Sequence, residues 1–142
     1  KVIVPLGVGG IVLVVLVLVF RRVSRTRAVA YAQTNLRRTA EAAELVAAAG
    51  SLADADRIRL ATEGEVDDLL LIDPDQSSND PEVVSVLATE AAWTGPARAE
   101  TVECVWVRIA AARDSFATVF GTGTDCSADE ASAAEPGAWP EP

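Results

Sequence analysis

Residues 11–20 read IVLVVLVLVF and run directly into RRVSRTR, residues 21–27. The stretch from Val2 to Phe20 contains no charged residue, and as an α-helix it would be about 28 Å long. The hydrocarbon core of a bilayer is about 30 Å thick, so length and composition predict a transmembrane helix over residues 1–20. A helix buried in a protein core is the rival interpretation. It is disfavoured because such a helix normally carries a polar stripe.

Four arginines follow the apolar stretch: Arg21, Arg22, Arg25 and Arg27. Positively charged residues beside a membrane helix tend to face the cytoplasm. The sequence therefore predicts a single-pass protein of the inner (plasma) membrane whose C-terminal body is cytoplasmic. The same arginines are predicted to bind anionic lipid headgroups. A cleaved signal peptide is disfavoured, because no small-residue cleavage site follows Phe20.

Two glycines of the apolar stretch, Gly7 and Gly10, stand three residues apart. Small residues let a second helix approach closely in lipid, so both are predicted to form a packing site for another membrane helix. The alternative is that they are there only because glycine is common in membrane helices.

The net charge of −9 is unevenly distributed along the chain. Residues 1–50 carry seven positive and two negative side chains, which gives +5, whereas residues 51–142 carry five positive and nineteen negative ones, which gives −14. An acidic body repels polyanions, so nucleic acid is not expected as a partner.

Residues 21–49 contain neither Gly nor Pro and are rich in good helix formers. This composition predicts that the first helix continues as a basic juxtamembrane helix over residues 21–50. Gly50 is a natural stop, and Ser51 can cap the next helix. Apolar residues, most of them small, recur along this helix at helical spacing: Val29, Ala32, Leu36, Ala40, Ala43 and Val46.

Helical patterns also dominate residues 51–120, with helices predicted over 52–72, 80–93 and 96–120 and a loop over 73–80. No long alternation of polar and apolar residues indicates a strand. The predicted fold class is all-α: one N-terminal transmembrane helix continues into a small antiparallel cytoplasmic helical bundle. Residues 121–142 are predicted to form an extended acidic, proline-containing tail. In the last predicted helix, apolar residues recur every three or four positions: Val102, Val105, Trp106, Ile109, Ala112, Phe116 and Val119.

Side chains that carry catalysis or bind metals are scarce. Histidine is absent, and two cysteines are too few for a Cys₄ metal site. The loop that begins at Asp73 opens like a calcium-binding loop, but Ser78 replaces the required glycine and Val84 the required glutamate. The sequence therefore predicts no catalytic residue, cofactor, metal or small-molecule substrate.

Cys104 and Cys126 are predicted to be free thiols, because the cytoplasm keeps thiols reduced. A body outside the cytoplasm would instead make a disulfide between them the expected state.

The C-terminal stretch PGAWPEP, residues 136–142, places Trp139 between prolines. Tryptophan is the residue most enriched among interface anchors, and prolines limit the conformational entropy that binding must remove. Trp139 is therefore predicted to bind a partner subunit. Packing on the chain's own body and a solvated terminus are the alternatives.

Together these features predict a non-catalytic, single-pass membrane accessory subunit. It would bind and stabilise a larger bacterial membrane complex through integral membrane protein subunits and the lipid bilayer, and a respiratory-chain assembly is one candidate. The alternative is a membrane-anchored signalling or regulatory adaptor that recruits a cytoplasmic partner. An enzyme that uses only carboxylates and hydroxyls is disfavoured.

Overall fold

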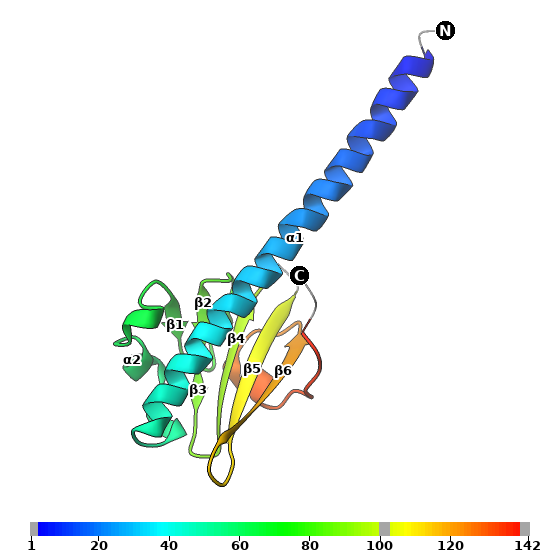
Figure 1. The fold of residues 1–142 in the computed structure, drawn as a ribbon. Coiled ribbons are helices and arrows are strands. Elements are labelled where there is room, and N and C mark those ends of the chain that lie inside the picture. Colours follow the sequence, from blue (N-terminus) through cyan, green and yellow to red (C-terminus); the bar gives the residue numbers. More distant parts are fainter. Residues whose placement is uncertain (1–2, 100–102, 140–142) are drawn as a thin grey trace.

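The computed structural model describes residues 3–99 and 103–139, with the backbone alone for residues 3–10 and 21–26. One long helix, α1 (Ile3–Ala48), leads into a small domain built on a six-stranded sheet. The C-terminal half of α1 lies across the sheet, and its N-terminal half projects away as a rod (Figure 1). We call residues 27–139 the head domain.

After α1 the chain forms three short helices, then six strands and then one more short helix. The sheet has the order β1-β2-β4-β5-β6, with β3 paired to β4. β1 and β2 are parallel, and the other pairs are antiparallel. The 3₁₀ and α-helices are η1 (Leu52–Asp54), α2 (Arg57–Leu60), η2 (Gly64–Val66) and α3 (Ala128–Ser132). The strands are β1 (Leu70–Ile72), β2 (Val83–Ser85), β3 (Leu87–Ala88), β4 (Ala92–Arg98), β5 (Cys104–Ala111) and β6 (Phe116–Gly123).

The predicted all-α fold is wrong, most clearly over residues 96–120. The described residues of this stretch form the end of β4, the whole of β5 and most of β6. Strand β5 is buried on both faces: Val105, Val107 and Ile109 belong to the core under α1, while Cys104 and Trp106 are buried on the other face. A strand that is covered on both faces shows no alternation of polar and apolar residues. The spacing of its apolar residues was therefore mistaken for that of a helix.

The two other predicted helices of the bundle are also largely wrong. Residues 52–72 hold three short helices and β1, and residues 80–93 hold β2, β3 and the start of β4. Residues 73–80 form a loop, as the turn-forming composition predicted.

The first helix was predicted to continue over residues 21–50, and α1 is unbroken to Ala48, two residues before Gly50. The predicted apolar stripe is the side of α1 that contacts β4 and β5. All six residues of the stripe are at most 8% exposed: Val29, Ala32, Leu36, Ala40, Ala43 and Val46. Their small size lets the helix approach the sheet closely.

The predicted transmembrane helix is wrong. Within the described residues, no helix combines the length and the apolar composition needed to cross a bilayer. The predicted inner-membrane location and the cytoplasmic placement of the body rested on that helix, so they are corrected with it.

The sheet face opposite α1 is covered by α3 and the residues that follow it. Arg108 of β5 lies on this face, and its Nη2 donates hydrogen bonds to the carbonyl oxygens of Ala131 and Ala134 at 2.6 and 2.8 Å. Residues 121–123, predicted as part of an extended tail, instead complete β6. Residues 133–139 have no helix or strand, and we call them the C-terminal tail.

Candidate interaction surfaces

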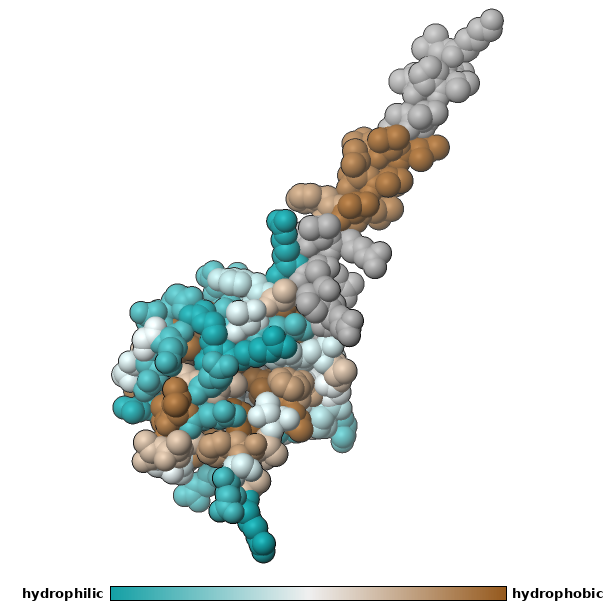
Figure 2. All heavy atoms as spheres, in the orientation of Figure 1, coloured by the Kyte–Doolittle hydropathy of each residue, from teal (hydrophilic) through white to brown (hydrophobic). Residues whose placement is uncertain are grey.

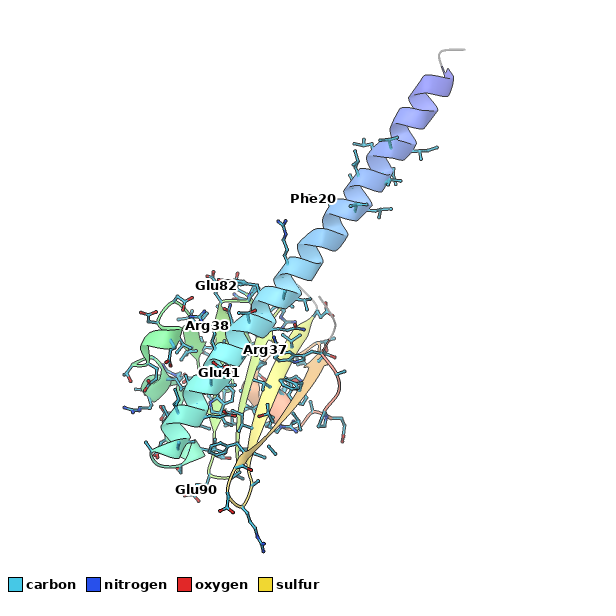
Figure 3. The ribbon with its side chains drawn as sticks, in the orientation of Figure 1. Phe20, Arg37, Arg38, Glu41, Glu82 and Glu90 are labelled. Carbon is cyan, nitrogen blue, oxygen red and sulfur yellow. A yellow bond between two sulfur atoms is a disulfide. The ribbon has the colours of Figure 1, made fainter. Side chains whose placement is uncertain are left out.

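The first candidate surface is the projecting part of α1, Ile11–Phe20, which we call the apolar segment. Its ten side chains are all Val, Leu, Ile or Phe, and each is between 44% and 74% exposed. Figure 2 shows this segment as a brown band with no part of the head domain against it. Phe20, at its end nearest the head domain, is 74% exposed (Figure 3).

The apolar segment is apolar on every side of the helix. Ten residues make nearly three turns at about 3.6 residues per turn, so consecutive side chains point in all directions around the axis. A helix that is hydrophobic all round is normally found buried. The segment is therefore an exposed apolar surface on every side of the helix.

The predicted packing glycines and headgroup-binding arginines lie on the same helix. Gly7 and Gly10, like Arg21, Arg22 and Arg25, fall where only the backbone is described. Arg27 is described, and it is exposed at the base of the projecting rod. The roles predicted for these residues in helix packing and lipid binding stay predictions.

The second candidate surface surrounds Trp139, which lies half-buried on its own head domain. Its indole Nε1 donates a hydrogen bond to the carbonyl oxygen of Trp106 at 2.9 Å. Its ring centroid is 4.5 Å from that of Phe120, and the guanidinium carbon of Arg37 lies 5.3 Å from the ring centroid. We call the surface formed by Arg37, Trp106 and Phe120 the tryptophan site.

Sequence reasoning singled out Trp139 but missed the residues that receive it. Arg37 lies on the part of α1 that crosses the sheet (Figure 3), and Phe120 lies on β6. No local pattern joins residues 37, 106 and 120, because their proximity depends on the helix crossing the sheet. Binding of a partner subunit by Trp139 stays a prediction.

The prediction of free thiols is wrong, because Cys104 and Cys126 form a disulfide with a Cα–Cα distance of 5.5 Å. Both cysteines are fully buried. The sheet register explains the pairing: Cys104 begins β5 opposite Gly123, three residues before Cys126. The prediction assumed a reducing cytoplasm, whereas disulfides persist mainly in oxidising compartments.

Polar contacts fix α1 against the segments beside it. The Arg38 guanidinium donates to both carboxylate oxygens of Asp68, at 3.1 and 2.5 Å, and to the carbonyl of Glu65. These hydrogen bonds lower the pKa of Asp68 and raise that of Arg38. On the same helix the Tyr31 hydroxyl donates to Glu82 at 2.7 Å, which raises the pKa of Tyr31. The partners are exposed and paired, which is typical of structural contacts.

Metal-binding clusters and surface depressions are the other kinds of candidate site within the described residues. Among them no group of three or more His, Cys, Asp or Glu side chains is placed to hold a metal ion. A shallow depression at the end of α1 contains Asp54 and Arg59 among its lining residues. Asp54 accepts a hydrogen bond from the Ser51 backbone at 2.9 Å, and Arg59 pairs with Glu63 at 3.6 Å. Both charged groups are thus used within the fold.

Comparison of the chain with protein-family models, with curated proteins and with solved structures finds no match. Function is therefore inferred from the two surfaces themselves.

Proposed function

We propose that the chain is a non-catalytic assembly subunit whose apolar segment binds between helices of other protein chains. One observation carries the proposal: ten consecutive aliphatic or aromatic side chains are exposed on a helix that the head domain leaves uncovered. Large exposed apolar surfaces mark interaction sites.

The free energy available from covering the segment is of the same order as the cost of association. Fully burying one Val, Leu, Ile or Phe side chain contributes about 1.5–3 kcal/mol. The ten side chains already lose about half of that gain to contacts along the helix, which leaves about 8–15 kcal/mol for the segment. Association costs roughly 4–15 kcal/mol, so complete burial is needed for a stable complex.

Complete burial requires more than one neighbour. A single partner helix covers one side of α1, and the apolar residues of the segment lie on all sides. We therefore expect two or more helices around each segment. Gly10, directly before the segment, would allow one of them to approach closely.

The head domain stays outside the contact between the apolar segment and the helices of other chains. The residues after position 50 carry a net charge of −14, which disfavours non-specific association of neighbouring heads. The buried disulfide supports a location of the head domain in an oxidising compartment.

The test compares substitutions in the apolar segment with a matched one on the head domain. Leu13→Gln/Leu16→Gln removes apolar surface but keeps good helix formers. Ile58→Gln makes a similar change at a head residue that is 67% exposed. Each full chain is purified in mild detergent from the producing cells, and its mass is measured by size-exclusion chromatography with light scattering. We expect the wild type and Ile58→Gln to elute in a multi-chain complex and Leu13→Gln/Leu16→Gln as a monomer.

A wild type that elutes as a lone monomer would contradict the proposal, as would a doubly substituted variant that keeps its partners. If Ile58→Gln alone loses its partners, the head domain is the binding element. An adaptor function then replaces the assembly function.

A further inference from the structure

The C-terminal tail is held on the head domain mainly by Trp139. Residues 135–138 are all exposed, and Gly137 N donates a backbone hydrogen bond to the carbonyl of Phe120 at 2.7 Å. Trp139 provides the hydrogen bond, the aromatic contact and the cation–π contact described above. The described part of the tail is thus an exposed connection with one aromatic anchor, Trp139.

The start of the tail is fixed separately from its end. Arg108 holds the carbonyl oxygens of Ala131 and Ala134, and the disulfide holds Cys126 on the sheet face opposite α1. Between Ala134 and Trp139 the exposed residues include a glycine, whose backbone has the widest conformational range. A change of backbone direction there would break the hydrogen bond from Gly137 to Phe120 and release Trp139, and it would leave α3 and the disulfide in place.

The tryptophan site does not depend on the tail for its shape. Arg37 belongs to α1, Trp106 to β5 and Phe120 to β6, all regular elements of the head domain. Trp106 supplies a carbonyl oxygen that accepts the indole N–H, and Phe120 supplies an aromatic ring beside the indole. Arg37 supplies a cation over the face of the indole ring. These three contacts suit a tryptophan side chain in particular.

We propose that the tryptophan site also binds the Trp139-bearing tail of a second copy of this chain, so that two copies exchange tails. An exchanged tail makes the same interactions on the second copy as it makes on its own head domain, because both copies carry the same tail and the same site. Exchange of an identical element is a low-cost route to a dimer. The inference does not depend on the apolar segment.

Concentration decides which form dominates. A short connection gives the chain's own tail an effective concentration in the millimolar range at its site. The fraction of tails bound to a second copy therefore rises as the local concentration of head domains approaches the millimolar range.

The first experiment asks whether the site accepts a tail that is not its own. The probe is a fluorescein-labelled synthetic peptide of residues 133–142, AAEPGAWPEP, added to the full chain carrying Trp139→Ala. We expect saturable binding by fluorescence anisotropy, and binding at least about tenfold weaker to the wild type, whose own tail competes. Binding should be lost for a peptide with Trp139→Ala and for the chain with Phe120→Ala/Trp139→Ala. No binding by a folded Trp139→Ala chain would overturn the proposal.

The second experiment retains Trp139 and asks whether the tail reaches another copy. A photo-crosslinking amino acid replaces Ala138, which is exposed, in a chain that also carries Leu13→Gln/Leu16→Gln. That background removes association through the apolar segment, so a failure here and a failure of the proposed function are distinguishable. Equal amounts of ¹⁴N and ¹⁵N chains are mixed and irradiated at rising concentration. We expect mixed-isotope crosslinks near Arg37 or Phe120 that increase with concentration, and crosslinks within single chains alone at millimolar concentration would overturn the exchange.

Discussion

At the scale of single residues, the packing of Trp106 depends on the absence of a side chain at Gly121. Trp106 is 1% exposed and lies opposite Gly121 in the β5–β6 register. A Cβ atom added to Gly121 would meet the indole ring of Trp106, at 2.8 Å from Cη2 and closer still to two other ring atoms. The sequence predicted only an extended tail from residue 121 onward, because the space that a glycine leaves for a distant indole produces no local pattern.

Gly121→Ala should destabilise the protein by about 1–3 kcal/mol, because the buried indole must move to admit the methyl group. Gly64→Ala is the matched control, since no atom lies within 4 Å of its added Cβ, and its effect should stay within about 0.5 kcal/mol. Denaturant unfolding followed by circular dichroism measures both changes. Equal stability of the two variants would show that the indole is not held against β6.

At the scale of elements, α1 combines two environments in one helix. Its C-terminal half contributes the buried stripe to the core beneath it, whereas the apolar segment has no cover within the chain. Even within the C-terminal half, burial depends on the side of the helix. Leu36 is fully buried and Leu45, less than three turns further on, is 59% exposed.

Leu36→Ala should lower the free energy of unfolding by about 2–5 kcal/mol, because it leaves a cavity between α1 and the sheet. Leu45→Ala makes the same chemical change, with the same small gain in helix propensity, at an exposed position. Its effect should stay within about 1 kcal/mol. Urea unfolding of both variants gives the difference, and a difference near zero would contradict the packing of α1 on the sheet.

At the scale of the whole molecule, the sheet is the middle layer between α1 on one face and α3 with its flanking residues on the other. The disulfide joins β5 to the segment that covers the second face, across 22 residues of sequence. It therefore restrains the unfolded chain over the whole β5–β6 hairpin and the approach to α3.

Cys104→Ala/Cys126→Ala should cost about 3 kcal/mol of stability, because opening this loop returns conformational entropy to the unfolded chain. Guanidinium unfolding of the variant and of the oxidised wild type measures the cost. Unfolding the wild type with a reductant is the control, and it should approach the variant. Identical midpoints for oxidised and reduced wild type would contradict the disulfide.

The sequence by itself determined the unbroken helix, the buried stripe from Val29 to Val46, the stop near Gly50 and the loop over residues 73–80. These features are encoded by residues close together in the chain, through helical periodicity and turn-forming side chains. The sequence also located both candidate surfaces, the apolar stretch and Trp139. Its assignment of the apolar stretch to a membrane was wrong, since hydrophobicity alone does not specify what covers it.

The sheet, the disulfide and the tryptophan site became evident only from the tertiary structure. Strands β4 and β5 are covered on both faces, so they lack the alternation that reveals a strand, and local spacing favoured a helix. The pairing of Cys104 with Cys126 and the meeting of Arg37, Trp106 and Phe120 follow from strand register and from the crossing of α1 over the sheet. Contacts between residues so far apart in sequence exist only once the layers have packed together.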